Sequence, residues 1–340
     1  MPPARTTPYR VLLVDEALTL GLRSRQVFAW GGLERVGRNT SPSRMLDAVL
    51  EWRPDVIVLD LSSGDAGLPA IEAVMAERPT PILVLHSGPN TNAFRALALG
   101  ALDMVTLPPR PDEDFWKDVA RRLVLLSQVR VVQHVQGKRR RRSAPEPSPS
   151  EAPFPLVAIA ASLGGPKALA QLLGGLPRNL AAPVCICQHI SEGFTHGLAS
   201  WLALETGHRV EEARDDAALE PGRIYVAPSR LHFRVAAPGR VMLVAVPPIQ
   251  GFRPSCDALL ESVAESFGKR AIGVILTGMG RDGAFGLKMI RDRGGRTVAQ
   301  DETTCVVWGM PREAVQLGAA QEVLPREQIP AQLIRWVAEC

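Results

Sequence analysis

Short apolar runs alternate with helical patterns along the first 130 residues of the chain. Runs of strand length occupy residues 11–14, 33–36, 55–59, 81–85 and 102–107, and segments with helical spacing occupy 18–30, 68–78, 91–99 and 112–127. Continuous apolar strands that are separated by helices are typical of a parallel sheet covered on both faces. We therefore predict a doubly wound α/β domain over residues 8–130.

The same alternation resumes after residue 153. Strands are predicted at 154–160, 183–188 and 271–277, and helices at 165–173, 194–204, 255–267, 284–293 and 326–338. Three more strand-like runs, at 224–227, 232–235 and 241–246, predict a β excursion from the main sheet. The fold class expected for the chain is therefore α/β, with two doubly wound parallel sheets and the second domain at 154–340.

A segment with neither pattern separates the two halves. Residues 131–153 include the basic run 138–142 and four prolines between Pro145 and Pro153. Such a segment buries too little apolar surface to offset the entropy lost on ordering, so a disordered linker is predicted.

The charge balance argues against a nucleic-acid-binding face. The 340 residues carry a net charge of +4, but residues 138–142 hold five of the 39 basic side chains, which leaves 34 basic against 35 acidic residues elsewhere. Aromatic residues make up only 5% of the chain, too few to favour a protein that stacks on single-stranded bases. The prediction is no nucleic-acid partner.

The apolar and cysteine content indicates a cytoplasmic protein. No stretch approaches the roughly 18 consecutive apolar residues of a membrane span, and residues 1–10 lack the apolar segment of a secretory signal. The five cysteines show no Cys-x-x-Cys spacing, which favours reduced thiols over a disulfide framework or a zinc site. No membrane insertion is expected.

Three carboxylates follow strands in the first domain. Asp15 and Glu16 end the first strand, and Asp60 ends the third. If these strands are neighbours, the carboxylates share one rim of the sheet, where a hard cation such as Mg²⁺ would offset their repulsion. Acidic loop residues in water remain an equal alternative.

Over residues 10 to about 130 this pattern resembles the receiver domains of two-component signalling. The resemblance implies a flavodoxin-like fold in which Asp60 accepts a phosphoryl group and Asp15, Glu16, Asp60 and the carbonyl of Ser62 hold Mg²⁺. It also implies a sensor histidine kinase as partner.

The receiver pattern is incomplete in this chain. His86, followed by Ser87, stands where receivers carry Ser or Thr, and Leu107 stands where they carry Lys before Pro108. Leucine cannot neutralise phosphoryl oxygens as lysine does. We therefore hypothesise a degenerate receiver that is poorly phosphorylated or acts through a partner interface.

In the second domain, Ser162 follows a predicted strand and precedes Gly164-Gly165-Pro166. The glycines permit a tight turn, and proline suits the first turn of a helix, whose N–H groups could face a developing oxyanion. This is the pattern of a nucleophile elbow. Taken by itself, a serine at this place is more often a helix cap.

Two other groups follow strands of the same predicted sheet. His189 ends the run 183–188, and Asp282 lies in the loop after 271–277. Each signal is weak separately, since a single histidine is usually structural. Together with Ser162 they put a nucleophile, a base and an orienting carboxylate where parallel sheets hold their sites.

The loop that contains Asp282 also fits a dinucleotide-binding fingerprint. Gly278, Gly280 and Gly283 spell Gly-x-Gly-x-x-Gly, and Asp301 follows at a suitable distance. However, Asp282 would place a negative charge beside the pyrophosphate. A dinucleotide-binding protein is thus a remote alternative.

Several motifs of the second domain resemble the catalytic domain of the chemotaxis methylesterases, the CheB family. They are Ala161-Ser162-x-Gly164-Gly165-Pro166, Gln188-His189-Ile190, Arg253-Pro254-Ser255, Leu276 to Gly283 and Ala299-Gln300-Asp301-Glu302. A receiver, a linker and a hydrolase follow in the same order in that family, so the resemblance covers nearly the whole chain.

The resemblance implies hydrolysis of glutamate γ-methyl esters on methyl-accepting chemotaxis receptors, and often deamidation of receptor glutamines. Ser162 would be the nucleophile, His189 the base and Asp282 its orienting partner. The backbone N–H groups near Leu163 and Met279 are our candidates for the oxyanion site. No cofactor is expected for catalysis, and Mg²⁺ would belong to the receiver domain.

Two positions depart from the family pattern near the expected active site. Leu163 stands where threonine is usual, and Phe252 stands where histidine is usual.

A different class of function also stays open, in which the chain is a non-catalytic adaptor that binds receptors or a kinase.

Overall fold

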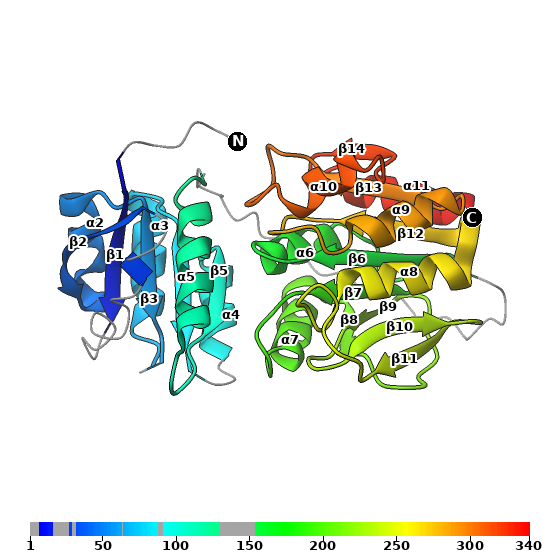
Figure 1. Ribbon diagram of the computed structural model, residues 1–340, viewed down its shortest axis with the longest axis horizontal. Coiled ribbons are helices and arrows are strands. Elements are labelled where there is room, and N and C mark those ends of the chain that lie inside the picture. Colours follow the sequence, from blue (N-terminus) through cyan, green and yellow to red (C-terminus); the bar gives the residue numbers. More distant parts are fainter. Residues whose placement is uncertain (1–6, 16–26, 29–31, 63, 88–90, 130–153) are drawn as a thin grey trace. The chain divides into compact units, whose positions relative to one another are not determined.

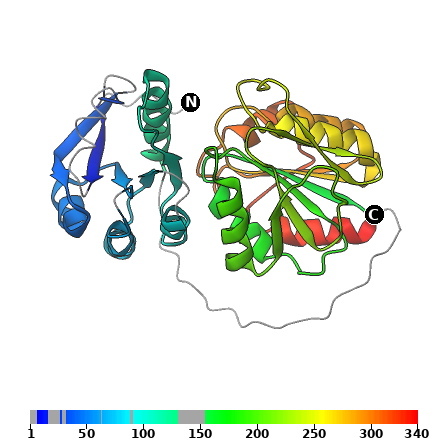
Figure 2. The ribbon, with the colours of Figure 1, turned by 90° about the horizontal axis from the view of Figure 1, so that it is seen from below.

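The computed structural model describes residues 7–15, 27–28, 32–62, 64–87, 91–129 and 154–340. The chain divides into two compact units, Met1–Lys138 and Arg139–Cys340. Each unit contains its own parallel sheet with helices packed against it (Figures 1 and 2). The predicted linker at 131–153 lies outside the described residues.

The first unit has a five-stranded parallel sheet in the order β2-β1-β3-β4-β5. Its strands are β1 (Tyr9–Asp15), β2 (Leu33–Thr40), β3 (Val56–Asp60), β4 (Ile82–His86) and β5 (Asp103–Thr106). This is the flavodoxin-like order, so the fold predicted for this half of the chain is confirmed. The apolar runs form the strands because both faces of the sheet are buried.

The helices of the first unit are α2 (Met45–Trp52), α3 (Gly67–Glu77), α4 (Thr91–Ala98) and α5 (Glu113–Leu126), with a short 3₁₀ helix η2 at Pro42–Arg44. The hydrophobic pattern assigned no helix to α2. The helix predicted at 18–30 lies mostly outside the described residues.

The second unit has a seven-stranded parallel sheet in the order β14-β13-β12-β6-β7-β9-β8. The strands are β6 (Leu156–Ala161), β7 (Val184–Gln188), β8 (Arg209–Glu212), β9 (Arg223–Val226), β12 (Ala271–Ile275), β13 (Arg296–Gln300) and β14 (Glu322–Leu324). The prediction for 224–227 was wrong in one respect, because β9 pairs with β7 inside the main sheet. Only β10 (His232–Ala236) and β11 (Arg240–Val244) form a separate antiparallel pair.

Helices of this unit are α6 (Gly165–Gly174), α7 (Thr195–Thr206), α8 (Cys256–Phe267), α9 (Ala284–Asp292), α10 (Met310–Gln316) and α11 (Ile329–Glu339), with a 3₁₀ turn η3 at Gly268–Arg270. Five of the six α-helices match predicted segments. The sequence pattern missed α10 and the strands β8, β13 and β14, which are short and carry polar residues.

The order of the second sheet reverses at β6. From this strand the chain moves to β7 on one side, and it returns later to β12 on the other. The crevice at the carboxyl ends of the strands beside such a reversal is where parallel sheets bind their ligands. The fold therefore places the ends of β6, β7 and β12 next to one another.

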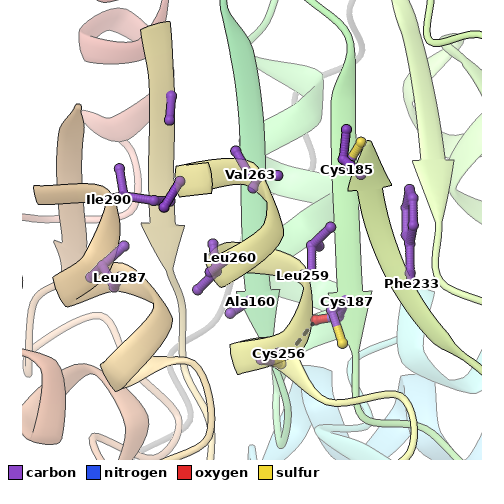
Figure 3. Packing of buried hydrophobic residues seen from close by; sticks show 14 of the residues in the cluster. Ala160, Cys185, Cys187, Phe233, Cys256, Leu259, Leu260, Val263, Leu287 and Ile290 are labelled. Carbon is purple, nitrogen blue, oxygen red and sulfur yellow. Dashed lines mark hydrogen bonds between the residues drawn. The ribbon is translucent and has the colours of Figure 1, made fainter. Parts of the chain in front are cut away.

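Helix α8 packs over this part of the sheet and forms much of the core. Figure 3 shows Leu259, Leu260 and Val263 from α8 against Ala160 from β6, with Cys187 on β7 close by. At the start of the helix, Ser255 Oγ accepts a hydrogen bond from the N–H of Ala258 at 3.4 Å, as in a helix cap. This packing carries the N terminus of α8 to the carboxyl ends of the strands.

Within the described part of the chain, no helix has both the length and the apolar character that a membrane crossing requires.

Candidate active site

Ser162 and His189 follow neighbouring strands at the same edge of the sheet. In the pairing of β6 with β7, Ala161 lies opposite Gln188. Ser162 follows Ala161 in the chain, and His189 follows Gln188. The N–H of His189 donates to the carbonyl of Ala161 at 3.0 Å. Because paired strands lie about 4.8 Å apart, the two residues are neighbours across the sheet edge.

The turn after β6 presents Ser162 at the start of α6. Gly164 has a φ of 76°, and a Cβ there would lie 2.6 Å from Val306, so the turn requires glycine for both conformation and space. The N–H of Ser162 donates to the carbonyl of Thr277 at 3.1 Å, which ties the turn to the residues after β12. The predicted elbow is therefore present.

Asp282 holds His189 by a direct hydrogen bond. His189 Nε2 lies 2.8 Å from Asp282 Oδ2, and the Asp282 side chain is fully buried. The carboxylate also accepts hydrogen bonds from Ser255 Oγ at 2.8 Å, from the N–H of Cys256 at 2.7 Å and from the N–H of Asp257 at 3.0 Å. The N terminus of α8 thus supplies the donors that keep this buried carboxylate ionised.

These contacts shift the pKa values of the pair in opposite directions. Burial by itself would lower the pKa of His189, but the neighbouring Cys256 sulfur and the Asp282 carboxylate raise it. Burial would raise the pKa of Asp282, but the hydrogen bond and charge of His189 and the backbone donors lower it. The carboxylate therefore favours a protonated imidazole, which a general base becomes during catalysis.

The second ring nitrogen of His189 has no protein partner. Nδ1 is buried and makes no hydrogen bond to any described residue. No hydrogen bond joins it to Ser162 Oγ within the described part of the chain. Nδ1 is the nitrogen left available for a proton from the serine, because Nε2 is held by Asp282.

Phe252 covers the imidazole of His189. The two rings are stacked with centroids 4.1 Å apart and an angle of 1° between their planes. The turn that carries Phe252 is tied down by Gln250, whose amide donates to Asp257 Oδ2 at 3.2 Å and accepts from Arg281 Nε at 3.0 Å. The departure from the family pattern at Phe252 therefore lies in direct contact with the predicted base.

Leu163 and Met279 carry the two N–H groups that are our candidates for the oxyanion site. The N–H groups of Leu163 and Met279 donate to no acceptor among the residues described. The carbonyl of Leu163 accepts from Thr277 Oγ1 at 3.0 Å, which joins its turn to the loop after β12. A Cβ at Gly278 would lie 2.8 Å from that of Ser162, so this loop closely approaches the serine.

The glycine-rich loop does not present a phosphate site. Asp257 Oδ1 accepts hydrogen bonds from the N–H groups of Gly283 at 2.9 Å and Gly286 at 2.8 Å, so it occupies the N terminus of α9. Burial, with the charge of Asp282, raises the pKa of Asp257 to about 6 against these hydrogen bonds. A dinucleotide pyrophosphate would meet two carboxylates there, which argues against the remote alternative.

Sequence reasoning assigned no role to the residues that support Asp282, although Ser255 stands in one of the quoted motifs. Ser255 caps α8, Cys256 and Asp257 begin it, and all three donate hydrogen bonds to the carboxylate of Asp282. His232 adds to them, because its Nδ1 accepts from the N–H of Ser255 at 3.3 Å. The available signal was the position of Ser255 as a cap before an apolar helical segment.

In the first unit, the structure places two of the three predicted acidic residues together. Asp15 and Asp60 lie opposite each other in the pairing of β1 with β3, and the N–H of Ser62 donates to Asp60 Oδ1 at 2.8 Å. Paired carboxylates are the ligand type that Mg²⁺ prefers. Glu16 lies outside the described residues.

The two receiver positions that depart from the pattern are both buried. His86 ends β4 and is fully buried, and Leu107 follows β5 with only 4% of its surface exposed. The N–H of Leu107 donates to the carbonyl of His86 at 2.7 Å. An apolar side chain thus occupies the position at which the receiver pattern has a lysine.

A parallel α/β domain with a serine, a histidine and a buried aspartate at adjoining strand ends defines a site of the serine hydrolase class. The family described as CheB methylesterase matches residues 157–333, and this chain belongs to that family.

Relatives cover nearly the full length of the chain. The protein-glutamate methylesterase FrzG of Myxococcus xanthus is 54% identical over 98% of this chain and 99% of its own length. The protein-glutamate methylesterase/protein-glutamine glutaminase 2 of Anaeromyxobacter dehalogenans (strain 2CP-C) is 46% identical over 96% of both chains. The crystal structure of the Thermotoga maritima CheB methylesterase catalytic domain matches with a TM-score of 0.52 and 39% identity, covering 54% of this chain and 98% of that one.

Replacement of Asp282 by asparagine should lower the pKa of His189. The amide keeps the shape of the carboxylate but loses the charge that raises this pKa, whereas burial continues to lower it. An NMR titration of the histidine ring protons in the wild type and Asp282→Asn measures the change. His208, which is bonded to the carbonyl of Leu173, is the internal control, and an unchanged pKa of His189 would contradict the assigned pair.

Proposed function

We propose that this protein is a serine hydrolase that removes methyl esters from glutamate side chains of methyl-accepting chemotaxis receptors. The observation that carries the proposal is the His189–Asp282 pair, which lies beside Ser162 with one ring nitrogen of the histidine free. The names of the two full-length relatives support the reaction and the kind of substrate.

The first half of the reaction forms an acyl-enzyme. Ser162 Oγ attacks the ester carbonyl carbon while Nδ1 of His189 accepts the hydroxyl proton. When the tetrahedral intermediate collapses, the bond to the methoxy oxygen breaks and the imidazolium returns the proton to it, so that methanol leaves.

The second half repeats these steps with water. Nδ1 accepts a proton from a water molecule as its oxygen attacks the acyl carbon, and the proton then passes to Ser162 Oγ as the serine leaves. The products are the free enzyme and a glutamic acid side chain, which releases its proton to solvent and becomes a carboxylate. These steps need only side chains and backbone groups of this chain and no cofactor.

Two features of the site stabilise the charges that form. Asp282 stabilises the imidazolium and fixes the ring, since it already holds Nε2 at 2.8 Å. The N–H groups of Leu163 and Met279 would donate to the oxyanion of the tetrahedral intermediate. Loss of one such donor typically costs about 10²- to 10³-fold in rate.

The same site fits deamidation of receptor glutamines. The amide carbon would be attacked in the same way, and the imidazolium would protonate the departing ammonia. This second activity is favoured by the name of the Anaeromyxobacter relative, which includes protein-glutamine glutaminase.

The first unit would regulate the hydrolase through a sensor histidine kinase. Asp60 is the candidate phosphoacceptor, and Asp15 and Asp60 would contribute to a Mg²⁺ site with Glu16. Because Leu107 supplies no positive charge, phosphorylation of Asp60 would be slow.

The proposed substrate and the five free cysteines fit a cytoplasmic location.

The adaptor alternative does not explain the buried Asp282. Three donors from α8 and the ring of His189 surround this carboxylate, and burying a charge is costly unless it is paired. A protein that only binds receptors has no need of this arrangement.

Ser162→Ala should abolish methanol release from methylated receptor while the domain stays folded. The loss should be about three orders of magnitude or more, because the reaction loses its nucleophile. Release of methanol is measured with the full chain, and circular dichroism checks folding. Ser266→Ala, which removes a hydroxyl bonded to the carbonyl of Val235, is the matched control and should keep the activity. Wild-type rates in Ser162→Ala would defeat the proposal.

Leu107→Lys should speed labelling of Asp60 by a small phosphodonor in the presence of Mg²⁺. A lysine at the end of β5 would bring a positive charge to the phosphoryl oxygens, which leucine does not. Labelling is followed by mass spectrometry, with Asp60→Asn as the control that should remain unlabelled. Rapid stoichiometric labelling of the wild-type chain would refute a degenerate receiver.

A further inference from the structure

Two buried cysteines converge on the imidazole of His189 beside the hydrolase site. Cys187 precedes His189 by two residues on β7, and Cys256 begins α8. Both thiols are fully buried. Figure 3 shows the two cysteines at one end of the hydrophobic cluster, with Cys256 Sγ donating to the carbonyl of Cys187 at 3.5 Å.

The distances suit a tetrahedral metal site. One sulfur from each cysteine and one ring nitrogen of His189 all lie within 4.8 Å of one another. Cys256 Sγ is 3.5 Å from His189 Nε2. Bond lengths of about 2.3 Å to sulfur and about 2.0–2.1 Å to nitrogen would separate such ligands by about 3.5 Å in a zinc tetrahedron.

Asp282 lies beside this group without belonging to it. Its Oδ2 is 2.8 Å from His189 Nε2. Two sulfurs and an imidazole nitrogen form a ligand set for zinc-like cations and leave the fourth position open, whereas Mg²⁺ prefers oxygen ligands.

We propose that Cys187, Cys256 and His189 form a binding site for a thiophilic divalent cation such as Zn²⁺, and that its occupation inhibits the hydrolase. The inhibitory part rests on the function proposed for Ser162. A cation on Nε2 replaces the hydrogen bond to Asp282 and leaves the ring proton on Nδ1. The ring then has no lone pair to accept the proton of Ser162.

The proton balance of binding follows from the state of the thiols. Burial raises the pKa values of the Cys187 and Cys256 thiols. Each thiol releases one proton to solvent as its sulfur bonds the cation. Neither sulfur is oxidised, so a chelator should reverse the inhibition.

Cobalt binding tests the site directly. Co²⁺ is added to the reduced full chain, and cobalt–thiolate charge-transfer absorption is recorded for the wild type, Cys187→Ala, Cys256→Ala and Cys185→Ala. Cys185 is the matched control because it is buried on the same strand two residues earlier. Loss of either ligand should weaken binding by at least roughly tenfold, and the control should bind as the wild type does.

Zinc titration tests the consequence for activity. Methanol release by each chain is measured with increasing Zn²⁺ and scaled to its own metal-free rate. The wild type and Cys185→Ala should lose activity and regain it with a chelator, whereas Cys187→Ala and Cys256→Ala should require at least roughly tenfold more Zn²⁺.

Specific outcomes would overturn the proposal. If cobalt gives no thiolate absorption, or if the absorption survives in both ligand variants, the proposed metal site does not exist. If Zn²⁺ binds without loss of methanol release, the site does not inhibit the hydrolase. A wild-type chain that binds cobalt but has no metal-free esterase activity would support the site and contradict the proposed function instead.

Discussion

The buried carboxylate of Asp282 is the constraint on which the active-site region depends. An ionised carboxylate without partners would cost far more on burial than the domain could offset, so each of its lone pairs must be satisfied. The donors come from the first turn of α8, and the remaining partner is His189 at the end of β7. One charge thus fixes the positions of the loop after β12, the start of α8 and the end of β7.

The same constraint explains why the site contains more than three residues. Because Cys256 donates its backbone N–H to Asp282, its sulfur is held beside the imidazole, and Cys187 lies on the strand beneath. The ring of Phe252 stacks on the imidazole of His189. A carboxylate, two thiols and an aromatic ring therefore surround the imidazole of His189.

Much of the fold could be predicted because its strands are buried on both faces. The runs 184–187 and 271–275 hold no charged or amide side chain, and they stand out against the helical patterns between them. The strands at the edges of the second sheet could not be found in this way. Arg209–Glu212 and Glu322–Leu324 carry polar residues, and their pairing depends on contacts with distant strands.

The site was predictable only in part, for a similar reason. Ser162, His189 and Asp282 each follow a strand, and a parallel sheet gathers such positions at one edge. The sequence places Phe252 near the site only through the family resemblance and does not place Cys256 there, because no spacing in the sequence shows where a helix will cross a sheet. Their place required the packing of α8 over β6 and β7.

Labelling with a fluorophosphonate is the most direct measurement of whether Ser162 and His189 act as one unit. We expect the wild-type chain to be labelled once, on Ser162, and His189→Ala to slow this labelling strongly because the serine loses its base. Labelling of a different residue, or an undiminished rate on Ser162 in His189→Ala, would contradict the account.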